Sequence, residues 1–484
     1  MGSLPCPHFV IFPFMSQGHT IPVLHLSRLL CHRSAAVTIV TTAGNSKSIR
    51  DYLLDIDVSI IELSFPQNIP GVPPGVENTH KLPSMASFLP FVKSTKLMQK
   101  SFEQALETLN PPVSCIISDG FLGWTLKSAQ KFNVPRLVFF GMGNFSCTMY
   151  QILGREKPHV NTKSLDEPFL IPGFSNLKLT RNDFAPPFND IEPSGEHVEF
   201  MNEQIMAMTM SYGVIVNSFY ELESSYVDYW NEKIGPKAFN VGPLSAAAPP
   251  PPPPPEVMEK PSYVKFLDQQ LVKREPVLYV AFGTQAEVSE EQVKEICKGL
   301  EKSDVSFLWA MKKGFEFLKE FEERTKNRGK IVTKWVDQLE ILRHGGVKGF
   351  LSHCGWNSVM ESISAGVPIV AIPFMAEQHM NARFVAEEVA VGLRVMARGG
   401  SVKGFVEAEE VERVVRELMG GERGAEVRRK VAEYGGAACA AMRDGGSSWR
   451  TLDLLVDDVC RKVKGVSFCG LNGHKEDVAC WIDE

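Results

Sequence analysis

The sequence lacks the features that mark membrane, secreted or nucleic-acid-binding proteins. No run approaches the roughly 20 apolar residues that span a bilayer, so we expect no transmembrane segment. Residues 1–7 carry no Lys or Arg and the apolar stretch 8–14 is short, which argues against an export signal. The 10 cysteines form no C-x-x-C pair, a pattern that indicates reduced thiols and a cytoplasmic location. The formal net charge of −6 disfavours a nucleic-acid partner.

Several motifs of well-known chemistry are also missing. The chain has no P-loop, no H-E-x-x-H zinc motif and no G-x-S-x-G nucleophile elbow. The stretch Gly141–Ser146 starts like a dinucleotide fingerprint but ends in Ser146 instead of the third glycine, which disfavours a dehydrogenase. Asp55-Ile56-Asp57 has D-x-D spacing, but it precedes an apolar run, whereas ligands of parallel sheets gather at strand carboxyl ends. We therefore expect neither a metal site nor a resident cofactor.

What the chain does contain is two series of short apolar runs separated by helical patterns. The first series is His8–Pro13, Ala36–Thr41, Ser114–Asp119, Arg136–Phe140 and Tyr212–Ser218. The second is Val277–Thr284, Ser306–Met311, Lys330–Trp335, Gly349–His353, Pro368–Pro373 and Gly392–Met396. Near-continuous apolar runs are typical of strands buried on both faces, which means parallel sheets with helical crossovers. The sequence predicts an α/β protein with two such sheets.

A proline-rich stretch separates the two series. Seven consecutive prolines, 249–255, cannot form a helix or a central strand, so we interpret residues 245–262 as a stiff linker. The predicted units are an N-terminal domain, 1–244, and a C-terminal domain, 263–447. A last helix over 448–463 could belong to either unit, including by packing back on the N-terminal one. Residues 464–484 show no periodicity and are expected to be disordered.

The first domain offers a candidate acid–base pair. Residues 16–20 are predicted to form the loop between a strand ending at Pro13 and a helix starting near Ile21, which places His19 at a strand carboxyl end. A histidine there can act as a general base, although a plain helix-start role fits equally well. Asp119 ends another strand of the same sheet, where its carboxylate could orient the imidazole and stabilise its protonated form. Asp119 could also cap the helix after Trp124.

The second domain offers a candidate anion site. The pattern predicts a strand over Phe350–Ser352, a turn at Gly355 and a helix near Asn357–Ser364. The N-terminus of a helix presents free backbone amides, which can bind a diphosphate. His353, Asn357 and Ser358 would add side-chain donors at that point. Trp335 could stack on a planar base, and Glu361 could accept from two sugar hydroxyls. Each of these residues taken alone also fits an ordinary structural role.

The whole segment from Trp335 to Gln378 resembles the signature box of plant secondary-product glycosyltransferases, which use UDP-sugars. The resemblance extends to the His19 region, to Asp119 and to Val280–Thr284. It implies the GT-B fold, in which two Rossmann-like α/β domains face each other across a cleft. It also implies that His19 and Asp119 form the catalytic dyad. The implied UDP-sugar contacts are Thr284, Trp335, Gln338, His353, Gly355, Trp356, Asn357, Ser358, Glu361, Glu377 and Gln378.

Within these contacts the resemblance assigns separate roles. Trp335 stacks on uracil, Gln338 contacts the nucleoside and Glu361 holds the ribose hydroxyls. The diphosphate is held by His353, Asn357 and Ser358 with Thr284, and the sugar hydroxyls by Glu377 and Gln378. Trp356 stands where members that prefer UDP-glucose have tryptophan.

Three positions depart from the family pattern. Asp337 replaces the usual Pro, Glu377 replaces the commoner Asp, and Gly141 stands where relatives often carry Thr or Ser near the sugar 6-hydroxyl.

The resulting expectation is an inverting, metal-independent, UDP-glucose-dependent glucosyltransferase that forms β-glucosides of a small lipophilic acceptor, such as a flavonoid. The predicted acceptor pocket consists of Phe14, Met15, Phe88, Phe121, Gly141 and Phe200. Open alternatives are a C-glycosyltransferase acting on a phenolic ring carbon, a terpenoid or hormone acceptor, and a nucleotide-sugar-binding protein without turnover. We expect a monomer that binds a UDP-sugar and a small acceptor.

Overall fold

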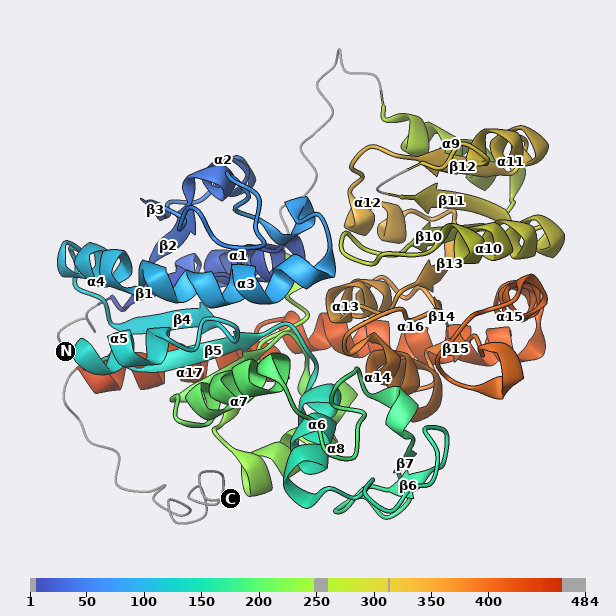
Figure 1. Ribbon diagram of the computed structural model, residues 1–484. Helices are drawn as coiled ribbons and strands as arrows, with labels where there is room; N and C mark the ends of the chain where they lie inside the picture. Colours follow the sequence, from blue (N-terminus) through green and yellow to red (C-terminus); the bar gives the residue numbers. More distant parts are fainter. Residues whose placement is uncertain (1–5, 248–259, 312–313, 464–484) are drawn as a thin grey trace.

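The computed structural model describes residues 6–247, 260–311 and 314–463 and contains two parallel β-sheets (Figure 1). The N-terminal sheet has seven strands in the order β3-β2-β1-β4-β5-β8-β9, and every neighbouring pair is parallel. In chain order these strands are β1 (His8–Phe12), β2 (Ala36–Thr42), β3 (Ser59–Leu63), β4 (Cys115–Asp119), β5 (Arg136–Phe140), β8 (Gly213–Val216) and β9 (Ala238–Asn240).

The C-terminal sheet has six strands in the order β12-β11-β10-β13-β14-β15, again all parallel. They are β10 (Val277–Ala281), β11 (Ser306–Ala310), β12 (Gly329–Val332), β13 (Val347–Ser352), β14 (Ile369–Ala371) and β15 (Gly392–Arg394). In both sheets the chain starts in the middle, builds outward to one edge, and then reverses. This doubly wound order leaves a crevice at the carboxyl ends of the central strands, where ligands bind in such folds.

Helices cover both faces of each sheet (Figure 1). In the N-terminal half they are α1 (Gln17–Cys31), α2 (Ala43–Tyr52), α3 (Phe88–Ser94), α4 (Gln99–Glu107), α5 (Thr125–Lys131), α6 (Asn144–Glu156), α7 (Glu196–Thr209) and α8 (Tyr220–Tyr229). In the C-terminal half they are α9 (Ser262–Lys273), α10 (Glu290–Ser303), α11 (Leu318–Thr325), α12 (Gln338–Arg343), α13 (Trp356–Ser364), α14 (Gln378–Arg383), α15 (Ala408–Gly420), α16 (Glu422–Met442) and α17 (Ser447–Val463). The short strands β6 (Phe169–Leu170) and β7 (Lys178–Leu179) form a separate antiparallel pair.

The predicted strands are all present, and the expected fold class is confirmed. Two strands that the runs did not predict, β3 and β9, extend the N-terminal sheet at its two edges. The loop expected over residues 16–20 is wrong: α1 begins at Gln17, with Ser16 as its N-cap, so His19 lies in the first helical turn. The proline run and the C-terminal tail lie outside the described residues.

The last helix, α17, packs on the N-terminal sheet although it follows the C-terminal domain in sequence (Figure 1). Leu452, Leu455 and Val459 belong to the same buried cluster as residues of β1, β2 and β4. Arg33, just after α1, fixes the helix: its Nε donates to Asp453 Oδ1 over 2.6 Å and its guanidinium lies over the Trp449 ring. The chain therefore returns to its first domain.

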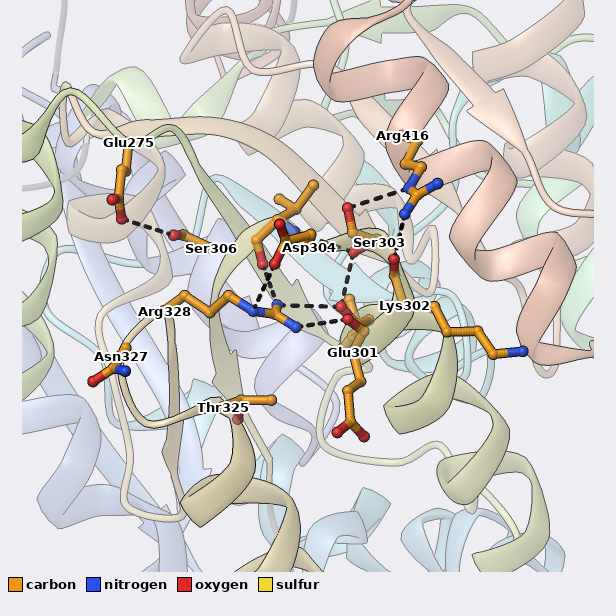
Figure 2. Close-up of polar contacts among 12 residues, drawn as sticks. Glu275, Glu301, Lys302, Ser303, Asp304, Ser306, Thr325, Asn327, Arg328 and Arg416 are labelled. Atoms are coloured by element: carbon orange, nitrogen blue, oxygen red, sulfur yellow. Dashed lines mark hydrogen bonds and ion pairs between the residues drawn. The ribbon is translucent and has the colours of Figure 1, made fainter.

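Arginine side chains hold the C-terminal end of α10 within the C-terminal domain (Figure 2). The last carbonyls of a helix have no intrahelical donor, and a cationic group there also interacts favourably with the helix dipole. Arg328 donates to the carbonyl oxygens of Leu300, Glu301 and Val305, and Arg416 donates to those of Lys302 and Ser303.

Across the part of the chain that is described, no helix is both long and apolar enough to cross a membrane.

Direct contacts join the two domains on either side of the cleft. Arg394 of β15 and Asp183 form a fully buried ion pair, with Nη1 and Oδ1 3.1 Å apart. Nearer the sheet edges, Gln285 Nε2 donates to Ser16 Oγ over 2.9 Å. Residues at the carboxyl ends of strands from both sheets line one cavity between the domains.

Candidate active site

The carboxyl ends of neighbouring strands bring His19 and Asp119 together. β1 and β4 pair in parallel, so the residues that follow β1 lie beside Asp119 at the end of β4. His19 Nδ1 and Asp119 Oδ2 are 2.7 Å apart, and Asp119 Oδ1 accepts the backbone N–H of Phe121 over 2.9 Å. A carboxylate only accepts, so Nδ1 of the neutral imidazole carries the proton and Nε2 keeps its lone pair. The pair has the arrangement of a base and its orienting carboxylate.

The surroundings of His19 favour its protonated form. Burial of the imidazole lowers its pKa, but the charge and hydrogen bond of Asp119, with a further contribution from Glu377, outweigh burial. The pKa of His19 consequently lies above its ordinary value of 6.5. A base with a raised pKa is a stronger proton acceptor near neutral pH.

The N-terminal end of α13 forms the opposite wall. Gly355 is its N-cap, and the imidazole of His353 packs against the backbone: a Cβ built on Gly355 or on Gly283 would come within 2.6 Å of His353 Nε2. Burial lowers the pKa of His353 to about 4, so this imidazole is neutral near pH 7. Its Nδ1 is buried without a hydrogen-bond partner among the described residues. Helix amides and a neutral imidazole together suit an anionic ligand.

A hydrogen-bonded group of side chains lies one turn further along α13. Gln338 Nε2 donates to Ser358 Oγ over 2.9 Å and to Glu361 Oε2 over 2.8 Å, and Tyr279 is 3.3 Å from Gln338 Oε1. Burial raises the pKa of Glu361 to about 7, with Asp337 adding to the effect while Gln338 and Arg343 oppose it. The group combines acceptors and donors of the kind that bind hydroxyls.

Trp335 and Asp337 lie between β12 and α12. Trp335 lies beyond the end of β12, which stops at Val332, and its side chain is 74% exposed at the cavity. Asp337 is the N-cap of α12, because its Oδ1 accepts the backbone N–H groups of Leu339 and Glu340. This capping gives Asp337 a structural role at the position where the family resemblance leads us to expect proline. It starts α12 at Gln338.

Glu377 is the N-cap of α14, which begins at Gln378 at the same edge of the sheet. Burial raises the pKa of Glu377, although His19 partly offsets it. Gln378 Oε1 accepts the backbone N–H groups of Phe374 and Met375 over 3.0 and 3.1 Å. The carbonyl end of Gln378 therefore stabilises its own loop, which leaves the Nε2 end to contact a ligand.

Trp356 and Asn357 contact the N-terminal domain. The indole of Trp356 is 2% exposed, donates from Nε1 to the Asn217 carbonyl over 2.8 Å and packs against Gly143, where an added Cβ would come within 2.6 Å of the ring. Asn357 Nδ2 donates to the Gly18 carbonyl. Both residues therefore join α13 to the facing domain.

One cavity of ≈ 3160 Å³ connects the two sheet edges. Of the predicted UDP-sugar contacts, it is lined by Thr284, Trp335, Gln338, His353, Gly355, Trp356, Asn357, Ser358, Glu361, Glu377 and Gln378. Of the predicted acceptor residues, it is lined by Phe14, Phe88, Phe121 and Gly141, whereas Met15 and Phe200 belong to the buried core behind it. The ring centroids of Phe14 and Phe121 lie 5.6 and 5.4 Å from that of His19.

The sequence analysis did not single out two residues that contact the predicted site. Asn217 follows β8 directly and bonds Asn357, and Tyr279 in β10 bonds Gln338. The sequence could have predicted Asn217, because it lies in the run Tyr212–Ser218, near the carboxyl end of a predicted parallel strand. Tyr279 carried no such signal, since a tyrosine inside an apolar run fits a core position equally well.

Comparison with known proteins shows which family the chain belongs to. Residues 263–418 match the family model described as UDP-glucoronosyl and UDP-glucosyl transferase. UDP-glycosyltransferases 90A1 and 90A2 of Arabidopsis thaliana are 48% and 45% identical to the chain; the alignments cover 94% of it in both cases, and 96% and 98% of the relatives.

Solved structures show the same fold over nearly the whole chain. UGT73P12 of Glycyrrhiza uralensis, complexed with glycyrrhetinic acid 3-O-monoglucuronide, has a TM-score of 0.84 at 28% identity, with 95% of this chain and 97% of that chain covered. UGT2 of Phytolacca americana, complexed with UDP-2fluoro-glucose and pterostilbene, has a TM-score of 0.77 at 29% identity, with 94% and 100% covered. The chain therefore belongs to the plant UDP-glycosyltransferase family and is a UDP-glycosyltransferase of the GT-B fold.

Proposed function

We propose that this enzyme transfers glucose from UDP-glucose to a hydroxyl group of a small lipophilic acceptor, a flavonoid or another phenol, with inversion at the anomeric carbon. The observation that carries the proposal is the His19–Asp119 pair, which opens onto a cavity with an apolar wall on one side and hydrogen-bonding groups on the other. A lipophilic nucleophile and a polar nucleotide sugar need those two environments, and the imidazole lies between them.

The donor assignment rests on the C-terminal wall. In the proposed complex Trp335 stacks on uracil and Gln338 contacts the nucleoside. Glu361 accepts from the ribose hydroxyls, and the α13 amides with His353, Ser358 and Thr284 hold the diphosphate. In this proposal the amide of Asn357 is engaged by Asn217 and the Gly18 carbonyl rather than by the diphosphate. Glucose is the preferred hexose in this proposal, and a related enzyme of known structure holds UDP-2fluoro-glucose.

The acceptor assignment rests on aromatic rings beside the base. Phe14, Phe88 and Phe121 have ring centroids 5.2–6.0 Å apart and line the cavity next to His19. Phe88 and Phe121 are partly buried and present flat apolar surfaces, on which an aromatic acceptor packs well, and the buried ring of Phe14 packs against both of them. Two related structures are complexed with aromatic molecules, one with pterostilbene and one with quercetin.

The proposed reaction has one displacement step. His19 Nε2 takes the proton of the acceptor hydroxyl while the oxygen attacks the anomeric carbon opposite the diphosphate. The bond between that carbon and the phosphate oxygen breaks, and UDP leaves with the electron pair. The α-linked donor thereby gives a β-glucoside. Asp119 stabilises the imidazolium, and helix amides with His353 stabilise the leaving diphosphate, the work that a metal ion does in other enzymes.

The test uses the purified full-length chain with UDP-glucose and a panel of flavonoids, simple phenols, terpenoid alcohols and hormones. Mass spectrometry identifies hexosylated products, UDP release gives rates, and NMR coupling gives the anomeric configuration. Acid-labile β-O-glucosides of phenols, formed equally well with a chelator present, support the proposal. An α-linked product, an acid-stable C-glycoside, a strict requirement for Mg²⁺ or Mn²⁺, or activity confined to terpenoid alcohols or hormones would contradict it.

A monomeric state and a cytoplasmic location belong to the same proposal. Gel filtration of the purified chain tests the first, and microscopy of a fluorescent fusion tests the second.

A further inference from the structure

Asn217 makes three hydrogen bonds at the junction of the two domains. It follows β8, is 4% exposed, and accepts the indole N–H of Trp356 at its backbone carbonyl. Its side chain donates from Nδ2 to Asn357 Oδ1 over 3.1 Å and accepts the backbone N–H of Leu244 at Oδ1 over 2.8 Å. One residue therefore contacts the start of α13 and the end of the N-terminal domain.

The bond from Asn217 selects the orientation of the Asn357 amide. An asparagine amide has a donor end and an acceptor end, and exchanging them reverses every contact. Because Asn217 donates to Asn357 Oδ1, the Nδ2 end of Asn357 must face the Gly18 carbonyl, to which it donates. A flipped amide would place two oxygens against each other there.

The Gly18 carbonyl has a particular need for this donor. In an α-helix it would accept the N–H of the residue four positions later, which is Pro22, and proline has no N–H. Asn357 supplies a donor from the other domain in its place. The first turn of α1, which carries His19, is therefore secured by a side chain of α13.

We propose that Asn217 is a positioning residue for His19, acting through Asn357. By fixing the amide of Asn357, it holds the first turn of α1 against α13, so that the imidazole keeps its place between Asp119 and the bound sugar. The inference rests on the proposed function, in which His19 is the base. It assigns Asn217 no contact with either substrate.

The test compares Asn217→Ala with Asn182→Ala in the full-length enzyme. Asn182 is a matched control: it is 7% exposed and donates from Nδ2 to Asp166 Oδ1 over 2.9 Å and to Ser401 Oγ of the other domain over 3.2 Å, and neither partner belongs to α1 or α13. For each variant we would measure kcat, the pH dependence of kcat, the Kd of UDP-glucose by calorimetry, and Tm.

We expect Asn217→Ala to lower kcat roughly 10- to 100-fold, the cost of a misplaced catalytic group, while Kd changes less than about threefold. The acid limb of the pH profile should move to lower pH. Asp119 and Glu377 are the charged groups that raise the pKa of His19, and a displaced imidazole loses part of their effect. Asn182→Ala should stay within about threefold of wild type in kcat.

Asn217→Asp keeps the size of the side chain and the acceptor for the Leu244 N–H, but it cannot donate to Asn357. If Asn217→Ala fails to fold, the same measurements on Asn217→Asp test whether the bond to Asn357 is needed. A kcat within threefold of wild type, an unmoved acid limb, or a loss of UDP-glucose affinity in proportion to kcat would overturn the inference. His19→Ala is the reference: if it remains active, the proposed base is wrong, whereas an inactive His19→Ala beside a normal Asn217 variant refutes only the role of Asn217.

Discussion

The two sheets share one winding order, and their facing edges differ in chemistry. At the N-terminal edge the dyad of His19 and Asp119 lies among phenylalanine rings, with Phe14 fully buried. At the C-terminal edge the helix start of α13 gathers amides, an imidazole and the Gln338–Glu361 pair. A shared scaffold therefore provides the crevice, and the side chains that follow each strand decide what it accepts.

The comparison predicts that damage at the N-terminal edge affects turnover and that damage at the C-terminal edge affects donor binding. The edges also differ in how their residues are arranged along the chain. The proposed donor contacts, Thr284 apart, come from the continuous segment Trp335–Gln378, whereas the dyad joins positions 100 residues apart. Substitutions on the two sides provide the following tests.

The largest effect is expected for His19→Ala. Removing a general base should lower kcat by roughly 10²- to 10⁴-fold, because the acceptor hydroxyl then loses its proton to water. The Kd of UDP-glucose should stay nearly constant, since the proposed donor contacts lie on the other sheet. Steady-state kinetics measure kcat and calorimetry measures Kd. A large rise in Kd would show that catalysis and donor binding are not separated between the two sheet edges.

A smaller effect on the same edge is expected for Asp119→Asn. The amide retains a hydrogen-bond partner for the ring but not the negative charge that stabilises the imidazolium, so kcat should fall roughly 10²-fold. The neutral imidazole is the active form, and Asp119 raises the pKa of His19. The acid limb of the rate profile should therefore shift to lower pH in the variant. An unshifted limb would mean that His19 is not the group that titrates.

Sequence reasoning located the strands and brought His19 close to Asp119, because both predictions depend on simple rules. Apolar runs predicted the central strands, and the carboxyl ends of parallel strands meet at one edge, which placed His19 near Asp119. The start of α1 was missed because Gly18 and Pro22 weaken a helical pattern, and the structure provides the missing donor from Asn357 in the other domain. No local pattern reports a contact of that kind.

The predicted acceptor pocket shows the same limit in a different form. Phe14 and Phe200 are both buried aromatic residues of the N-terminal domain, yet only Phe14 lines the cavity. Which face of a buried ring borders a cavity depends on how distant segments pack, here α3, α7 and the turn after β4. Composition and periodicity carry no information on that packing.

At the C-terminal edge, Glu361→Gln should remove a pH dependence of donor binding. Burial raises the pKa of Glu361 to about 7, and ribose hydroxyls bind the carboxylate best. UDP-glucose affinity should therefore rise about tenfold from pH 6 to pH 8 in the wild type and stay flat in the variant. The diphosphate diester of UDP-glucose does not titrate in this range, so calorimetry reports the protein group. A flat wild-type profile would contradict the ribose assignment.

Sugar choice should also depend on the C-terminal edge. In the proposed complex, the axial 4-hydroxyl of galactose would leave the buried side chain of Gln378 without its hydrogen-bond partner. We therefore expect kcat/KM for UDP-glucose to exceed that for UDP-galactose by about tenfold. Gln378→Ala should reduce this ratio, because it removes the side chain proposed to bind the sugar hydroxyl. The substitution also removes the hydrogen bonds that hold the Phe374–Met375 backbone beside it. Competition kinetics with both donors give the ratio directly. An unchanged ratio would remove Gln378 from donor selection.

The smallest effect is expected for Gly141→Ser, where the two edges meet. A Cβ at Gly141 would lie 3.5 Å from His19 Cε1, an ordinary contact distance, so a small side chain fits without moving the imidazole. If the family resemblance holds at this position, the added hydroxyl would lie near the sugar 6-hydroxyl, and one extra neutral hydrogen bond is worth about 1 kcal/mol. We expect kcat/KM for UDP-glucose to rise by no more than about fivefold, with the rate for UDP-xylose, which lacks that hydroxymethyl group, unchanged. A loss of activity with both donors would show instead that Gly141 provides space that His19 requires, and that the dyad tolerates no side chain on its donor side.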